Sequence, residues 1–227
     1  MRERPVVAID GPAASGKSTT ARAVAKALGF THLDSGALYR ALTLVALERL
    51  GPAPRWEAEA IVAEARRLPV SVAAAAGVLE VTVGGLPLGD AIRSEAVTRE
   101  VSRVAAMSPV RAFVNDLLHA AAAEGGVVMD GRDIGTVVFP DAEVKVFLVA
   151  APEERARRRL ADRGRVPDPV TLKAEAGALL ARDEHDRSRD VAPLAQASDA
   201  VLIDTTQLGF DEQVRLVVDL VRKAAGG

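Results

Sequence analysis

The chain has 227 residues, of which 49% are hydrophobic and 26% charged, with a formal net charge of −2 and no cysteine. Its length suits one α/β domain with an insert and allows a substantial core. The nearly balanced charge disfavours a general nucleic-acid coat, and the lack of cysteine excludes disulfides, thiolate catalysis and cysteine-based metal sites. No apolar run approaches the roughly 20 residues that span a bilayer. Because the first predicted strand begins at Val6, we expect no signal peptide. We therefore expect a cytoplasmic monomer without nucleic-acid or membrane partners.

Residues 5–19 combine a strand, a glycine-bounded loop and the start of a helix. The apolar run at 6–9 predicts a buried strand, and the pattern G-x-x-x-x-G-K-S follows in the context that a phosphate-binding loop requires. Backbone N–H groups of such a loop approach a polyphosphate, Lys17 adds charge for the outer phosphates, and the Ser18 hydroxyl is placed to ligate Mg²⁺. The residues predicted to hold the phosphates are Gly11, Pro12, Ala13, Ala14, Ser15, Gly16, Lys17, Ser18 and Thr19.

The rest of the chain alternates short apolar runs with helical patterns. Further buried strands are predicted at 31–33, 127–129, 144–149 and 200–203. Helices are predicted at 18–28, 38–50, 56–68, 94–106, 109–124, from 152, at 172–184 and at 211–223. This alternation predicts a mainly parallel sheet of five strands with helices on both faces.

Residues 69–88 break the alternation of strands and helices. Valine and leucine alternate there with small or polar residues, and Gly84 and Gly85 form a two-residue hairpin signal. We interpret this segment as a small antiparallel β insert.

Charged residues gather after the predicted strands. In open α/β sheets ligands bind beyond the carboxyl ends of the strands, where Asp10, the segments 34–40 and 130–133, and two arginine-rich helices follow. Transfer of a phosphoryl group needs positioning and positive charge more than covalent chemistry. An acceptor phosphate, with a second pKa of about 6, needs no general base. This agrees with the presence of three histidines that form no catalytic or metal-binding pattern.

Four arginines occupy the helix that begins at residue 152. Adjacent helical residues point in different directions. We expect Arg155 to face one ligand together with Arg159 or with Arg158, and Arg157 to face solvent.

Several motifs together are similar to those of the bacterial cytidylate kinases, a family of nucleoside monophosphate kinases. These are DGPAASGKST, LDSGALYR, SRVAAMSPVR, DGRDIGTVVFP, the ERARRR helix start and RDEHDRSRDVAPL. The resemblance covers nearly the full length of the chain. Many relatives have glycine in the phosphate loop where this chain has Ala14 or Ser15. The lid is short and contains residues 163–165, so the resemblance does not define its exact closing contacts.

The resemblance implies one P-loop kinase domain over residues 1–227, with an acceptor region at 35–111 that includes the insert at about 69–88, and a helical lid at 155–169. It implies ATP- and Mg²⁺-dependent phosphorylation of CMP and dCMP to the diphosphates, in pyrimidine nucleotide metabolism. The residues implied to bind the acceptor are Ser35, Tyr39, Arg40, Ser102, Arg111, Arg132, Asp133, Arg182, Asp186 and Arg189. The residues implied to act in transfer are Lys17, Arg132, Arg155, Arg159 and Arg182, with Arg158 at ATP.

Within the acceptor set, Ser102, Arg111 and Asp133 are implied to read cytosine. A carboxylate suits the N4 amino donor of cytosine, and arginine or serine suits its N3 and O2 acceptors. Two other functions remain open from the residues alone: another small-molecule kinase of the adenylate or shikimate type, and a nucleotide-dependent switch.

Overall fold

We describe a computed structural model of the chain, which covers residues 4–53, 55–75 and 77–225. The predicted domain at 1–227 and insert at 69–88 also include residues 1–3, 54, 76 and 226–227, which lie outside the described residues.

One mixed sheet forms the centre of the molecule, with the strand order β3-β4-β2-β6-β1-β7-β8 and β5 beside β4. The strands are β1 (Val6–Asp10), β2 (Thr31–Asp34), β3 (Val70–Ala75), β4 (Val78–Val83), β5 (Leu86–Pro87), β6 (Val127–Gly131), β7 (Val144–Val149) and β8 (Val201–Asp204). Within the described residues β2, β6, β1, β7 and β8 are all parallel neighbours. The prediction of five parallel strands is therefore confirmed.

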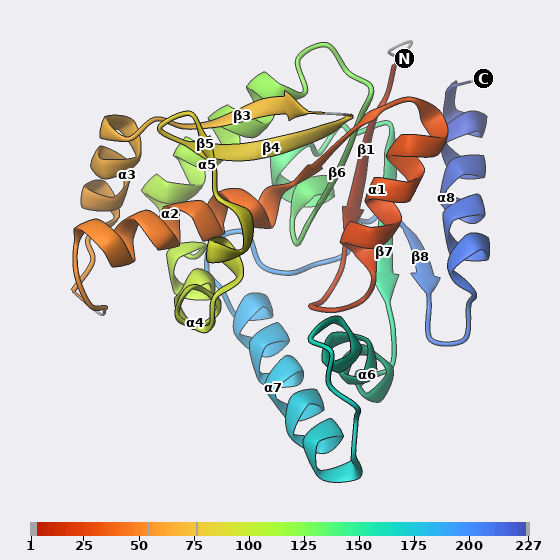
Figure 1. The fold of residues 1–227 in the computed structure, drawn as a ribbon. Coiled ribbons are helices and arrows are strands. Elements are labelled where there is room, and N and C mark those ends of the chain that lie inside the picture. The colour runs from red at the N-terminus through yellow and green to blue at the C-terminus, as the bar shows by residue number, and fades with distance from the viewer. Residues whose placement is uncertain (1–3, 54, 76, 226–227) are drawn as a thin grey trace.

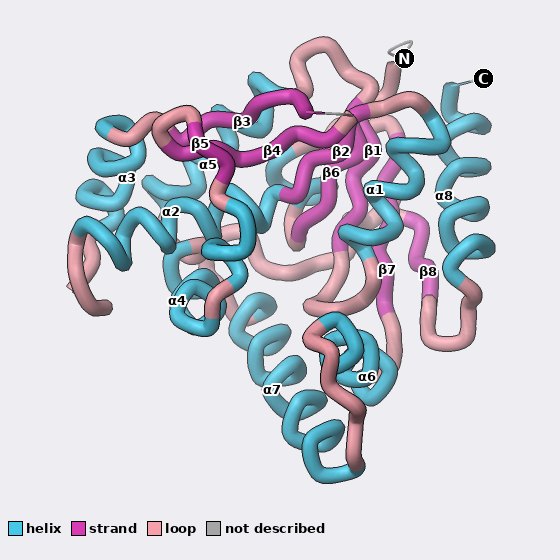
Figure 2. The backbone as a smooth tube through the Cα atoms, viewed as in Figure 1, coloured by secondary structure: helices cyan, strands magenta, loops and turns pink. Residues whose placement is uncertain are grey.

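The insert is antiparallel, as the alternating pattern predicts. β3 pairs with β4 from Val70 opposite Val83 to Ala75 opposite Val78. β4 also meets β2 in parallel where His32 faces Val78. The insert therefore extends the main sheet at its β2 edge (Figure 2).

The helices follow the predicted order with slightly different ends. They are α1 (Lys17–Leu28), α2 (Ser35–Arg49), α3 (Ala58–Arg67), α4 (Glu95–Val104), α5 (Ser108–Ala121), α6 (Pro152–Asp162), α7 (Pro169–Arg187) and α8 (Phe210–Ala225). Two short turns were not predicted, a 3-10 turn η1 (Gly89–Arg93) and a π turn η2 (Ile134–Val138). The start of α7 has a local cause, because the Asp168 carboxylate accepts from the Val170 and Thr171 amides and Pro169 occupies the first turn.

The central strands β1 and β6 are buried on both faces, which explains why each opens with an unbroken apolar run. Along β1, Val6 and Ala8 pack into a core with α2, α3, α4 and α5, whereas Val7 and Ile9 pack into a core with α1 and α8. Figure 1 shows α8 and α1 together on one side of the strands and α2 to α5 on the other. No described helix is both long enough and apolar enough to cross a membrane.

Helices α6 and α7 lie outside these two layers. They lie against each other at the end of the sheet where the loop between β1 and α1 is found, while the described ends of the chain lie at the opposite end (Figure 1). The carboxyl ends of the parallel strands therefore face a helix pair that neither layer covers.

Candidate active site

The site lies where β1, β2 and β6 end. Register places Asp34 opposite Asp130 and Asp10 opposite Gly131, so the polar residues that follow the three strands meet at one edge. A cavity of about 910 Å³ opens there and is lined by the phosphate loop, the acceptor region and α6 and α7. This volume is in the range of small-molecule sites.

The phosphate loop has the backbone that its glycines permit. Gly11 and Gly16 have φ of +151° and +90°, and a Cβ at Gly11 would clash with the Leu148 carbonyl of β7. Lys17 is buried and donates to the Pro12 carbonyl at 3.0 Å. Burial and then the charge of Arg132 lower the pKa of Lys17 to about 7. The loop therefore holds its lysine in a buried position, where a bound anion would favour the charged form.

Ser18 and two carboxylates meet beside the loop. The Ser18 hydroxyl donates to Asp130, whose other carboxylate oxygen lies 2.8 Å from His32 Nε2. Burial and the Asp130 charge raise the pKa of Asp34. A hydroxyl and carboxylate oxygens are the ligands that Mg²⁺ prefers, with its remaining positions held by phosphates and water, so this group fits a nucleotide-bound magnesium ion. Among the described residues, no group of three or more His, Cys, Asp or Glu could hold a metal by itself.

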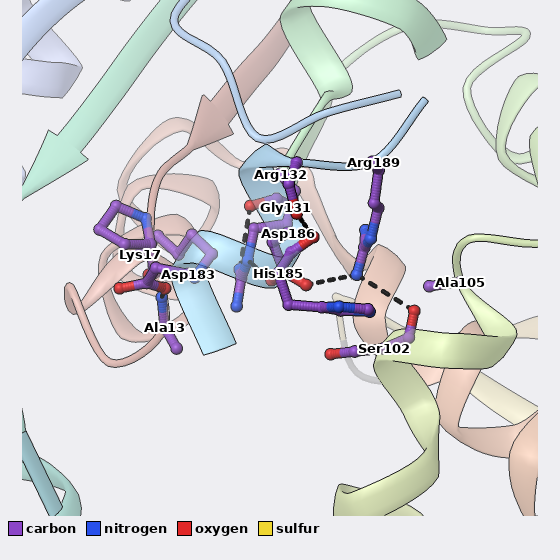
Figure 3. Close-up of polar contacts among 12 residues, drawn as sticks. Ala13, Lys17, Ser102, Ala105, Gly131, Arg132, Asp183, His185, Asp186 and Arg189 are labelled. Atoms are coloured by element: carbon purple, nitrogen blue, oxygen red, sulfur yellow. Dashed lines mark hydrogen bonds and ion pairs between the residues drawn. The ribbon is translucent and has the colours of Figure 1, made fainter. Parts of the chain in front are cut away.

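Asp186 of α7 positions two arginines across the cavity. It accepts from Arg132 Nε at 3.1 Å and from Arg189, and it is buried (Figure 3). Burial opposes ionisation of Asp186, but the charges of Arg132, Arg189 and Arg182 prevail and lower its pKa. Burial and the charge of Arg132 lower the pKa of Arg182 to about 10. The result is a concentration of positive charge suited to a phosphate.

A buried ion pair lies deeper in the acceptor region. Arg111, which is 3% exposed, contacts the Asp133 carboxylate and donates to the Ala105 carbonyl at 3.0 Å. Its guanidinium also lies 5.4 Å from the centre of the Tyr39 ring. Asp10 fixes the turn η2, which follows Asp133, since its oxygens accept from the Ile134 and Gly135 amides at 2.9 and 2.7 Å. These contacts give Arg111 and Asp133 a fixed orientation beside the cavity that they line.

Three further acceptor-side residues make hydrogen bonds to neighbouring segments. Ser35 donates to the Asp130 carbonyl at 2.7 Å. Arg40 donates to the Ile92 carbonyl at 3.1 Å and to the Thr98 hydroxyl at 3.0 Å. The Ser102 carbonyl accepts from Arg189 at 3.3 Å (Figure 3).

The arginines of α6 divide into two groups. Arg158 and Arg159 line the cavity, and Arg157 is exposed as predicted. Arg155 differs from the prediction that it faces the ligand. It is buried against the phosphate loop and Asp183 and does not line the cavity. A helical pattern gives the angle between side chains but not which face is turned toward a ligand.

The cavity gathers most of the predicted site residues. The exceptions are Gly11, Pro12, Ser15 and Arg155. Among the additional lining residues, Arg22 lies four residues after Ser18 on α1, so helical spacing alone could have found it. Leu208 and Phe210 follow β8 and obey the strand-end rule, whereas no sequence signal marks Arg93 in η1.

Comparison with known proteins identifies the family. A family model described as cytidylate kinase matches residues 7–223. A cytidylate kinase of Salinibacter ruber (strain DSM 13855 / M31) is 44% identical, covering 97% of this chain and 98% of that protein. A cytidylate kinase of Streptococcus pneumoniae (strain 70585) is 47% identical, covering 93% of this chain and 94% of that protein.

A solved structure shares the fold. It is that of an uncharacterized protein from Eubacterium ventriosum ATCC 27560, with a TM-score of 0.53 and 10% identity, covering 97% of this chain and 99% of that one. Because the family model spans nearly the whole sequence and the relatives align almost end to end, the chain belongs to the cytidylate kinase family.

Proposed function

We propose that the protein transfers the γ-phosphoryl group of ATP to CMP and dCMP, giving ADP with CDP or dCDP. Membership of the cytidylate kinase family supports the reaction. The observation that carries the proposal within the fold is a cavity that the phosphate loop lines together with Arg132, Arg182 and the Arg111–Asp133 pair.

The proposed transfer is a direct in-line displacement. An oxygen of the CMP phosphate attacks the γ-phosphorus, the bond from that phosphorus to the β–γ bridging oxygen breaks, and ADP leaves with the electron pair. Lys17, Arg132, Arg159 and Arg182 hold the charge that spreads over the phosphoryl oxygens. The acceptor is ionised at neutral pH, so no side chain has to remove a proton.

Nucleotide binding favours the protonated, charged form of Lys17. Lys17 has a pKa of about 7 because burial and Arg132 disfavour its charged form. A bound polyphosphate raises that pKa again and keeps the ammonium protonated. Mg²⁺, held by Ser18 and by Asp130 directly or through water, would neutralise part of the charge on the β- and γ-phosphates.

Selection of cytosine falls to the buried pair. The Asp133 carboxylate accepts from the N4 amino group, and Arg111 and Ser102 donate to N3 and O2. Uracil presents a carbonyl and an N–H at the corresponding positions, and buried groups left unpaired are costly. The pair therefore favours CMP over UMP.

The proposed organisation is one kinase domain with an acceptor region at 35–111 and a lid at 155–169 that closes over both nucleotides. Ser35, Tyr39, Arg40, Asp186 and Arg189 serve the acceptor sugar and phosphate, and Arg158 serves ATP. In this proposal the protein acts as a monomer. The need for ATP and nucleoside monophosphates favours the cytoplasm.

An acceptor panel tests the proposal. ATP and Mg²⁺ are supplied with CMP, dCMP, UMP, AMP or shikimate, and ADP and the phosphorylated product are both quantified. We expect one ADP per CDP formed, and a loss of turnover of about 100-fold or more in Lys17→Ala. AMP or shikimate as the preferred acceptor would identify another small-molecule kinase, and ATP hydrolysis indifferent to CMP would identify a switch. Either result contradicts the proposal.

A further inference from the structure

The backbone of Ala13, in the phosphate loop, is held on both sides by two buried charged residues. Its N–H donates to Asp183 Oδ1 at 2.9 Å, and its carbonyl accepts from Arg155 Nη1 at 3.1 Å. Arg155 and Asp183 also form an ion pair with each other and are 3% and 0% exposed. We call these two side chains the loop anchor. They join the loop, the start of α6 and the end of α7, and Figure 3 shows Asp183 against Ala13.

The residue after Ala13 has an unfavourable backbone conformation. Ala14 has φ of +58°, in the left-handed region, where its Cβ crowds the backbone. Such a conformation persists only where surrounding contacts determine it. The N–H and the carbonyl of Ala13 are both hydrogen-bonded to the loop anchor. These bonds restrain the backbone immediately before the unfavourable dihedral of Ala14.

Apolar packing surrounds the same point. Ala13 lies in a small cluster with Ala156 of α6 and with Ala176 and Leu179 of α7. The short side chains allow both helices to approach the loop, and water is kept from the ion pair by this packing. A charge pair in such surroundings is strongly oriented, because neither partner has an alternative bond to solvent.

We propose that Arg155 and Asp183 are positioning residues that set the ATP-binding conformation of the phosphate loop through Ala13, and so allow alanine at position 14. The inference rests on the proposed function, since it assigns the loop to ATP phosphates. The anchor acts on the donor side of the cavity. The residues proposed to read cytosine, Arg111 and Asp133, make no hydrogen bond to it.

The test compares binding of ATP and of CMP, each measured by calorimetry. Asp183→Asn keeps the shape of the side chain but removes its charge. Arg155→Lys keeps a charge but replaces the guanidinium, whose Nη1 donates to both Ala13 and Asp183, with a shorter side chain. We expect each to weaken ATP binding about tenfold and CMP binding less than about twofold. Arg157→Met, an exposed neighbour on α6, is the matched control and is expected to change neither.

A second substitution separates positioning from a general structural role. If the anchor restrains Ala14, Ala14→Gly should improve ATP binding in the Asp183→Asn background at least about threefold more than it does in the unmodified protein, because glycine adopts the left-handed region freely. Equal effects in the two backgrounds would overturn the proposal. So would unchanged ATP affinity in folded anchor variants, or an equal loss of ATP and CMP affinity.

A double variant and a hydrogen-exchange measurement test the loop anchor even if the single variants do not fold. If the single variants unfold, the double variant Arg155→Met/Asp183→Leu replaces the ion pair with apolar groups and takes their place in the binding test. Hydrogen exchange at the Ala13 amide is also measured in the unmodified protein without nucleotide. We expect that amide to be protected, and exchange at the rate of an open loop would contradict the proposal. CDP formation is assayed in parallel, so ATP binding without CDP would refute the acceptor assignment while leaving the anchor tested.

Discussion

Asp183 and Asp186 lie three residues apart on α7 and hold different parts of one cavity. Asp183 bonds to the Ala13 amide of the phosphate loop, whereas Asp186 bonds to Arg132 and Arg189. Asp186 holds together two arginines that would otherwise repel each other, and Asp183 holds an N–H group of the loop in place. At the scale of single residues, the site depends as much on these buried acids as on the arginines.

Asp133 is the residue on which base selection depends most directly. We expect Asp133→Ala to reduce kcat/KM for CMP about 100-fold or more and to shrink the preference for CMP over UMP, since the acceptor for N4 is lost. Initial rates with CMP and UMP at fixed ATP measure both effects. Asp116→Ala, an exposed carboxylate on α5, is the control. Unchanged selectivity in the Asp133 variant would show that another residue reads the base.

Asp10 makes the stability of the protein depend on pH. Burial, which outweighs the bonds from the Gly135 and Ile134 amides, raises the pKa of Asp10 from 3.8 to about 6. The folded chain therefore holds this proton more tightly than the unfolded chain. The stabilisation is fully present below the unfolded pKa and is lost as the pH rises through about 6.

The shift in the pKa of Asp10 corresponds to about 3 kcal/mol of folding stability. We expect the free energy of unfolding of the protein, minus that of Asp10→Asn, to fall by up to this amount between about pH 4 and about pH 7.5 in urea titrations. A difference that stays constant with pH would contradict the assignment.

At the scale of elements, the sequence predicts features of short segments but not contacts between distant ones. The phosphate loop and the five parallel strands were predicted because glycine spacing and apolar runs are properties of short segments. Arg155 was expected to face a ligand, but its partner Asp183 lies on another helix, 28 residues along the chain. No periodicity within α6 could reveal that pairing. The turn η2 was missed for a similar reason, because Asp10 of β1 holds its amides.

The contact between the phosphate loop and β7 gives an element-scale prediction. Gly11 has φ of +151°, and a Cβ there would meet the Leu148 carbonyl. We expect Gly11→Ala to lower the free energy of unfolding by roughly 3 kcal/mol or more and to abolish ATP binding. Gly29→Ala is the matched control, since Gly29 also has a positive φ of +65° but nothing within 4 Å of its Cβ position.

Gly29→Ala should cost only about 1 kcal/mol and preserve ATP binding. Urea denaturation and calorimetry measure both quantities. Equal losses in the two variants would show that the approach to β7 is not the cause.

At the scale of the whole molecule, one sheet with helices on both faces brings segments far apart in the sequence to one edge. The phosphate loop, the acceptor region and α7 line the same cavity although they span most of the chain. The family resemblance predicted this convergence, and the residues alone predicted only that ligands bind beyond the strand ends. We propose that this cavity holds two nucleotides with their phosphates facing each other.

A single ligand that joins cytidine to adenosine through five phosphates is the sharpest probe of this arrangement. Because it combines both substrates, it should bind more tightly than either one. Calorimetry should give one molecule per chain, and steady-state kinetics should show competition with ATP and with CMP alike. Two molecules per chain, or competition with only one of the two nucleotides, would contradict a shared cavity.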